Sequence, residues 1–198
     1  MFRRFVRFFP VLAFVLAAAC GAAPPDQRTP ATQAEIDELM QGILALGPEI
    51  DPKEAARAAE IAYRYSHQLA FQYQIEDPPL VHNTKVNMGI KPRGLCWHWA
   101  EDMENRLKAE GFQTLSLHRA IANDDNPWRI AHSTAIISKR GEAWDDGMVL
   151  DPWRNAGELH WDTVREDTKY KWVERTAALE ARLRREGRLL PDGTIVAK

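Results

Sequence analysis

The hydrophobic pattern of this chain changes at Gly111, and the change limits the folds that the chain can adopt. Before Gly111, apolar residues recur at the three- and four-residue spacing of amphipathic helices. After it, short segments alternate apolar and polar residues as strands do, for example Leu115 and Leu117 on either side of Ser116. We therefore expect an α+β fold in which N-terminal helices pack on an antiparallel sheet.

Local signals set the bounds of the expected elements. Thr32, with Glu35 three residues later, is the pattern of a capping box at the start of a first helix. A second helix begins with Asp51 as N-cap and Pro52 at the first helical position, and Glu54 is expected to complete a second box. The remaining expected elements are a helix over 96–108, strands over 112–121, 130–138 and 148–151, the last ended by Pro152, and a charged helix over 172–186.

The connection between the second and third expected helices is long and rich in proline, and covers residues 76–94. Ordered loops of this length are uncommon in compact domains unless they have a function. This one leads directly into Cys96, so we expect it to form one wall of a cleft. The sequence leaves open whether it moves as a lid.

The N-terminal segment has the pattern of an export signal. Arginines at the start precede an apolar run, Phe8 to Ala19, that is short for a permanent membrane span. The run from Leu16 to Cys20 also resembles the lipobox of bacterial lipoproteins, which implies lipidation of Cys20. The resulting division is a signal peptide over 1–19, a lipid-anchored tether over 20–32 and a single domain over 33–198. Gly21 after the lipid site implies the outer membrane, facing the periplasm; a simple cleaved signal is the alternative.

Export changes the meaning of the two cysteines and of the net charge. With Cys20 lipidated, Cys96 is the one thiol of the mature chain, and an unpaired cysteine in an exported protein is a candidate reactive group. Removal of the three arginines of the signal changes the formal net charge from −2 to −5. An acidic chain of this kind argues against nucleic acid as a partner.

Cys96 follows a turn signal, Pro92 to Gly94, and opens a helix-compatible run. The backbone N–H groups and the dipole at a helix N-terminus favour an anion, and a thiolate is such an anion. The same N–H groups are suited to hold the oxyanion of an attacked carbonyl. The alternative is a small buried hydrophobic residue without chemistry.

A base and an orienting group are available on the expected strands. A cysteine nucleophile needs a base in hydrogen-bond reach, and that base needs a third group to orient it. His132 begins one expected strand and Asp151 ends the next. If the two strands are antiparallel neighbours, His132 and Asp151 meet at one edge of the sheet, where the helix of Cys96 can complete the set. The alternatives are a hydrogen-bonded core histidine and an aspartate that caps a turn before Pro152.

The segments containing Cys96 with Ala100, His132, and Asp151-Pro152 together resemble the transglutaminase-like cysteine enzyme superfamily. The resemblance covers Gly94 to Trp153, about a third of the chain, and the Cys–His–Asp order also fits the broader papain-like group. It implies a papain-like or transglutaminase-like fold and acyl transfer through a thioester on Cys96. His132 would act as base and acid, and Asp151 would fix the imidazole tautomer.

Further candidate residues concern the oxyanion hole and the substrate cleft. Many papain-like enzymes place a glutamine before the cysteine to help form the oxyanion hole, and none lies between Gln74 and Cys96. The N–H of Cys96 is one candidate donor and Asn87 another. Trp97 and His160 are candidates to line the substrate cleft, although tryptophans near the site are more often core residues.

Two alternative interpretations of the sequence remain. One is a binding or scaffolding lipoprotein that keeps the fold without turnover; the pH dependence of Cys96 alkylation separates it from an enzyme. The other is a zinc site that uses Cys96, His132 and either Asp151 or His160. No HExxH or paired CxxC motif is present, so we expect no metal and no cofactor. The expected substrate is an amide of a peptide, a protein or a peptidoglycan peptide, and the membrane is a partner through the lipid anchor.

Overall fold

The computed structural model describes residues 27–191 and 193–196. The expected signal peptide (1–19), the lipidation site Cys20 and the tether up to residue 26 lie outside this range. Within the described residues, none of the helices combines the length and the apolar character that a membrane crossing requires.

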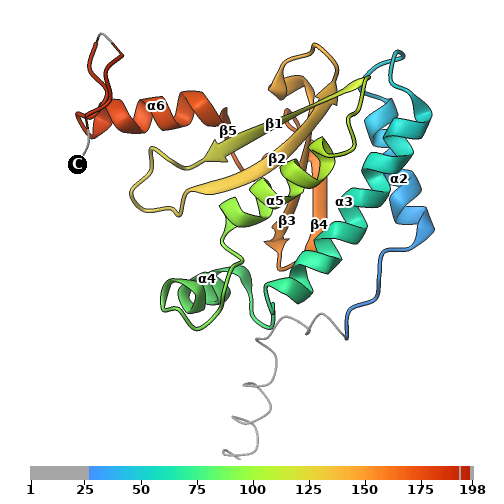
Figure 1. The fold of residues 1–198 in the computed structure, drawn as a ribbon, viewed down its shortest axis with the longest axis horizontal. Helices are drawn as coiled ribbons and strands as arrows, with labels where there is room; N and C mark the ends of the chain where they lie inside the picture. The colour runs from blue at the N-terminus through green and yellow to red at the C-terminus, as the bar shows by residue number, and fades with distance from the viewer. Residues whose placement is uncertain (1–26, 192, 197–198) are drawn as a thin grey trace, which may run out of the picture.

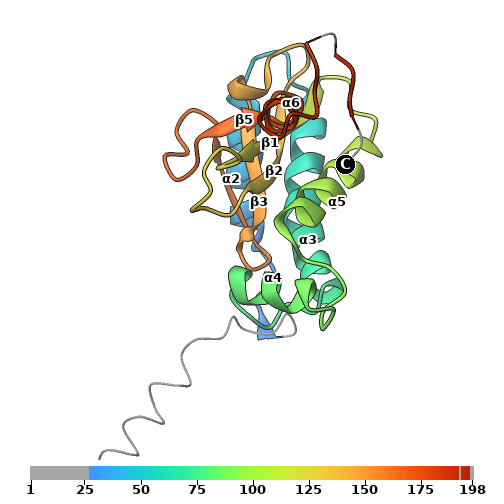
Figure 2. The ribbon, with the colours of Figure 1, turned by 90° about the vertical axis from the view of Figure 1, so that its left-hand side faces the viewer.

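The expectation of an α+β fold with an antiparallel sheet is confirmed. The five strands lie in the order β4-β3-β2-β1-β5, and every neighbouring pair is antiparallel. Helices α2, α3 and α5 pack together beside the sheet, whereas α6 extends from the β5 edge (Figures 1 and 2). The elements are α2 (Gln33–Leu44), α3 (Pro52–Gln72), α4 (Pro79–Asn87), α5 (Cys96–Lys108), β1 (Leu115–Ala122), β2 (His132–Lys139), η3 (Trp144–Asp146), β3 (Met148–Asn155), β4 (Glu158–Thr163), β5 (Trp172–Glu174) and α6 (Arg175–Arg185).

The two faces of the sheet belong to different cores. Ala135 and Ile137 of β2 join the cluster that α2, α3 and α5 form on one face. Ile136, between them, joins a second cluster on the other face with Val149 and Trp172. This alternation follows from the two-residue period of a strand. Because the two cores cover both faces, every residue of β2 from His132 to Ser138 is buried.

The helix starts confirm one predicted capping box and correct the other. Thr32 and Glu35 make the reciprocal contacts of a box at the start of α2. Asp51 caps α3, but the carboxylate of Glu54 does not turn back to it. Glu54 accepts hydrogen bonds from the backbone N–H groups of Gln113 and Thr114, at 2.6 and 2.8 Å. Glu54 thus ties the start of α3 to the segment that enters β1, a long-range contact that the local pattern did not indicate.

Pro152 does not end the third strand, as the sequence predicted. β3 continues to Asn155, and its pairing with β4 shifts register between Asp151 and Asn155. The pairing of β2 with β3 stops at Leu150, so no neighbouring strand requires the N–H that Pro152 lacks. The sequence prediction also missed β4 and β5, and it placed the start of α6 at Trp172, which belongs to β5.

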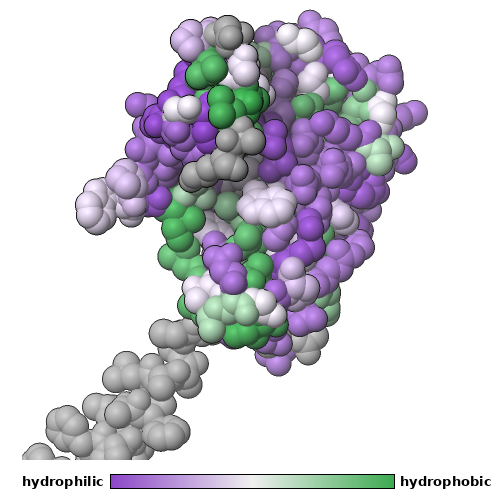
Figure 3. All heavy atoms as spheres, turned by 60° about the vertical axis from the view of Figure 1, so that its left-hand side comes forward, coloured by the Kyte–Doolittle hydropathy of each residue, from purple (hydrophilic) through white to green (hydrophobic). Residues whose placement is uncertain are grey.

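The expected loop 76–94 contains a short helix, α4. Figure 3 shows hydrophobic residues gathered on the surface at the end of the molecule where α4 lies. The exposed apolar side chains of this region include Leu80, Val81, Met88 and Ile90. The inward side of α4 carries buried His82 and Asn83, which connect it to the segment before Cys96 and to β3.

Candidate functional site

Cys96 is the first residue of α5, as the sequence predicted. The turn before it depends on Gly94, whose φ of +122° is a conformation that side chains rarely adopt. A Cβ at Gly94 would also overlap the ring of His82. His82 in turn hydrogen-bonds the carbonyl of Arg93 through Nε2, at 2.8 Å. The conformation of Gly94 and the ring of His82 together therefore fix the backbone just before the thiol.

His98 closes part of the helix N-terminus. Its Nδ1 accepts hydrogen bonds from the N–H groups of Gly94 and Leu95, each at 3.1 Å. Burial and the nearby Arg93 charge lower the pKa of His98, which keeps Nδ1 free to accept. The N–H groups of Cys96 and Trp97 have no acceptor within the described part of the chain. They are the donors that remain for an anion at this helix start.

His132 and Asp151 meet at the edge of the sheet, as antiparallel pairing of their strands predicted. The Nε2 of His132 and the Oδ2 of Asp151 are 2.6 Å apart, and both residues are 1% exposed. Burial alone would lower the pKa of His132, but the charge and hydrogen bond of Asp151, with a contribution from Cys96, raise it to about 9. Burial alone would raise the pKa of Asp151, but His132 and Arg154 hold it below its usual value. The pair is therefore an imidazolium and a carboxylate at neutral pH.

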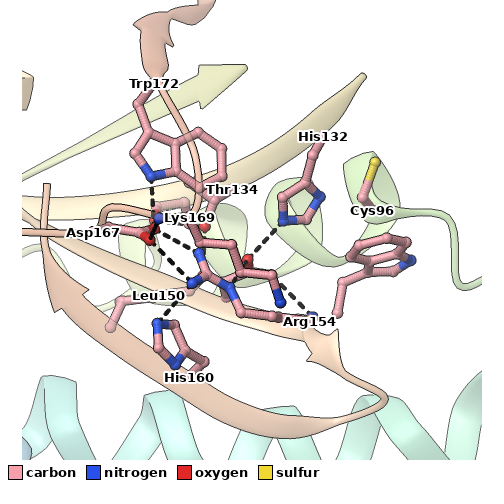
Figure 4. A network of polar contacts seen from close by, with 12 residues as sticks. Cys96, His132, Thr134, Leu150, Arg154, His160, Asp167, Lys169 and Trp172 are labelled. Atoms are coloured by element: carbon pink, nitrogen blue, oxygen red, sulfur yellow. Dashed lines mark hydrogen bonds and ion pairs between the residues drawn. The ribbon is translucent and has the colours of Figure 1, made fainter. Parts of the chain in front are cut away.

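Cys96 lies beside the second nitrogen of that ring. The Nδ1 of His132 is buried and has no hydrogen-bond partner among the described residues. The Sγ of Cys96 is 3.5 Å from the carbonyl oxygen of Ala131, the residue before His132. Figure 4 shows the thiol next to the imidazole at the end of β2, and the influence of Cys96 on the pKa of His132 agrees with this placement. The strand period places His132 on the face opposite α5, so the two side chains meet where the sheet ends.

Aromatic rings fix the orientation of the imidazole. The ring of Trp153 lies 4.5 Å from that of His132, and Tyr170 and Trp172 lie 4.6 and 5.4 Å away. Trp153 also belongs to the apolar cluster around Cys96. Packing on several sides limits rotation of His132 and keeps its two nitrogens directed at different partners.

Arg154 supports Asp151 and was missed by the sequence prediction. It donates to Asp151 through Nε at 3.1 Å, and it contacts both carboxylate oxygens of Asp167, at 3.2 and 2.6 Å. Trp172 donates to the same carboxylate at 2.9 Å, and His160 contacts Arg154 at 2.9 Å (Figure 4). Arg154 stands three residues after Asp151, so its closeness in the sequence could have indicated an ion pair with Asp151. The position of Asp167 had no comparable signal.

A cavity of about 380 Å³ opens beside the thiol, and Cys96, Trp97 and His132 line it. Trp97, predicted to line a substrate cleft, is 45% exposed. His160 does not line this cavity, because it is held behind Asp151 by Arg154. Asn87 does not line it either: it is exposed at the last position of α4.

The arrangement suits nucleophilic chemistry. A thiol at a helix N-terminus faces an imidazole whose other nitrogen is held by a buried carboxylate, which is the order of groups that activates a cysteine. Within the described residues, no group of three or more His, Cys, Asp and Glu side chains is arranged to hold a metal ion. Comparisons of this chain with protein-family models, with curated proteins and with solved structures found no match.

Proposed function

We propose that this chain is a thiol-dependent acyl-transfer enzyme that uses Cys96, His132 and Asp151. One observation carries the proposal: the buried imidazole of His132 has a carboxylate on one nitrogen, and its other nitrogen is unpartnered among the described residues and lies beside Cys96. A purely structural histidine at such depth would be expected to use both nitrogens. Here the second is left to a thiol that lines a cavity.

The proposed reaction has two halves. The Cys96 sulfur, its proton passed to Nδ1 of His132, attacks an amide carbonyl, and the N–H groups of Cys96 and Trp97 stabilise the oxyanion. His132 then returns the proton to the departing amine, which leaves a thioester. Water or a second amine, deprotonated by His132, attacks the thioester and releases an acid or a new amide together with the free thiol. Asp151 keeps the imidazole oriented throughout.

The family and the location form part of the same proposal. The Cys–His–Asp order, the cysteine at a helix start and the following antiparallel sheet support a transglutaminase-like or papain-like enzyme. The lipobox pattern around Cys20 supports a lipoprotein of the outer membrane that faces the periplasm. From that location, we propose a peptide, a protein or a peptidoglycan peptide as the amide substrate, and the membrane as a partner through the lipid anchor.

Alkylation of Cys96 by iodoacetamide between pH 5 and 9 tests the proposal. Because an imidazolium beside the sulfur favours the thiolate, we expect the native protein to react at pH 6 at least about tenfold faster than N-acetylcysteine. The variant His132→Gln should lose this advantage. His118→Gln is the matched control, since His118 is also a strand histidine bound to a side chain, Ser138, at 2.9 Å.

Acyl transfer itself is tested with an activated ester. Mass spectrometry after incubation with a p-nitrophenyl ester should show an acyl group on the native protein and none on Cys96→Ser. Identical alkylation profiles for the native protein and His132→Gln, with no acyl adduct, would instead support the binding or scaffolding lipoprotein.

A further inference from the structure

Arg119 is a buried arginine in the wall of the cavity that contains Cys96. It is 8% exposed and lies in β1. Its Nη2 donates to the carbonyl of Trp97 and to the hydroxyl of Ser133, each at 3.2 Å. Both acceptors are neutral, so neither compensates the charge of the guanidinium.

The hydrogen-bonding capacity of Arg119 is not filled. A guanidinium carries five N–H groups, and the Nε of Arg119 is buried without a partner among the described residues. Two carboxylates of α5 compensate its charge in part: Glu101 lies 3.9 Å from Nη1 with its side chain 41% exposed, and Glu104 acts on the guanidinium without forming an ion pair with it. Leaving a buried charge with this little compensation is unfavourable, which is why such groups usually have an ionic partner.

The other charges of the cavity do not supply that partner. Three arginines and one glutamate line it: Arg119, Arg175, Arg182 and Glu101. Arg182 forms its own ion pair with Asp124 outside the lining. The whole chain carries a formal net charge of −2, so the positive charge of this cavity is local.

We propose that Arg119 binds a carboxylate of the substrate, so that the acyl donor taken by Cys96 is an acidic peptide or amide. This inference rests on the proposed function. A carboxylate accepts charge-assisted hydrogen bonds from a guanidinium, and the Nη1 of Arg119 has no acceptor within hydrogen-bond distance among the described residues. Cys96 and Arg119 line the same cavity, so a carboxylate held by Arg119 would stand close to the carbonyl under attack. The acidic group then selects the substrate and also orients it.

The test compares two alkylating reagents of similar size, one negatively charged and one neutral. Iodoacetate carries a carboxylate, whereas iodoacetamide is neutral. We expect the ratio of their rates on Cys96 to be higher in the native protein than on N-acetylcysteine. Arg119→Gln should lower that ratio about five- to tenfold, the effect expected from one unit charge close to the reagent's carboxylate in a partly solvated site. Arg64→Gln, at an exposed position on α3, should leave it unchanged.

Further measurements keep the inference open to refutation. Arg119→Lys retains the charge and should retain most of the ratio. If Arg119→Gln does not fold, the native ratio should still fall as potassium chloride rises from 20 to 500 mM, measured against the same change on N-acetylcysteine. An unchanged ratio in Arg119→Gln would overturn the inference. So would an equal loss of rate with both reagents, because Arg119 would then act on the sulfur alone.

The alkylation ratio tests the acidic substrate, and the acyl adduct tests the proposed enzyme, so the two proposals can fail independently. A charge-dependent ratio without an acyl adduct would leave an anion-binding cavity in a protein that does not catalyse acyl transfer. An acyl adduct with no charge preference would leave the enzyme and remove the acidic substrate.

Discussion

The His132–Asp151 pair makes a specific prediction about stability and pH. The folded-state pKa of His132 is about 9, above its usual value of 6.5. A raised pKa means that the folded protein binds the proton more tightly than the unfolded chain does. The contribution to stability is therefore complete below pH 6.5 and is lost as the pH rises through 9. The cleanest background is Cys96→Ser, because the thiol can otherwise give its proton to the imidazole and hide the effect.

The size of the effect follows from the pKa values. A shift of one unit corresponds to 1.36 kcal/mol, so a rise from 6.5 to about 9 gives about 3 kcal/mol as an upper value. Cys96 contributes part of the rise, so we expect about 2 to 3 kcal/mol in Cys96→Ser. The pKa values of His98, His118 and His160 are lowered, mainly by burial. These histidines are neutral in both states above pH 7, so the window between pH 7 and 9 reports on His132.

The assay is urea unfolding of Cys96→Ser at pH 6, 7, 8 and 9, followed by tryptophan fluorescence. Two of the seven tryptophans, Trp153 and Trp172, contact the imidazole, so part of the signal comes from the site itself. The free energy of unfolding should fall between pH 7 and 9. In the double variant with His132→Gln it should not. Parallel curves for the two proteins would refute the assignment of a charged, Asp151-bound imidazole.

Three further substitutions test the surroundings of the site. Gly94→Ala should lower the free energy of unfolding by at least about 2 kcal/mol and slow alkylation of the thiol, because the new Cβ overlaps His82 at a positive φ; Gly89→Ala, which meets no atom within 4 Å, is the control. Arg154→Met removes the cation of Asp167 and leaves Asp151 with His132 alone, so urea unfolding should show a loss of about 3 to 5 kcal/mol at neutral pH and a smaller loss under acid conditions. Glu54→Ala releases the backbone donors at the entry to β1 and should cost about 1 to 3 kcal/mol, visible as a lower melting temperature without a change in the alkylation rate of the thiol.

The sequence predicted those parts of the site that are formed by elements consecutive in the chain. A turn followed by a helix was sufficient to place Cys96 at a helix N-terminus. His132 and Asp151 followed from two consecutive strands, since an antiparallel pair brings the start of one beside the end of the other. Both inferences need only local patterns and one pairing rule.

The parts that it missed depend on tertiary contacts. The link between Arg154 and Asp167 joins β3 to an irregular segment, and no periodicity marks such a segment in advance. Glu54 stands three residues after Asp51, the spacing of a capping box. Its carboxylate nevertheless accepts hydrogen bonds from the backbone N–H and the hydroxyl of Thr114, just before β1, and not from the start of its own helix. The strand β4 was missed although Asn155 and Gly157 flank the turn at Ala156, because Leu159 is its one buried residue and the strand therefore lacks a clear apolar alternation.

The buried charges of the site and of the neighbouring cavity bear on the anion that we propose at the sulfur. Asp151 and Asp167 are neutralised within their cluster, one by His132 and both by the shared Arg154. These four groups sum to zero when the imidazole is protonated. Arg119 then adds one buried positive charge, and the exposed Glu101 at 3.9 Å compensates it only partly. A negative charge at Cys96, or a carboxylate bound beside it, would complete the balance, and these are the anions that the proposed mechanism and the proposed acidic substrate would place there.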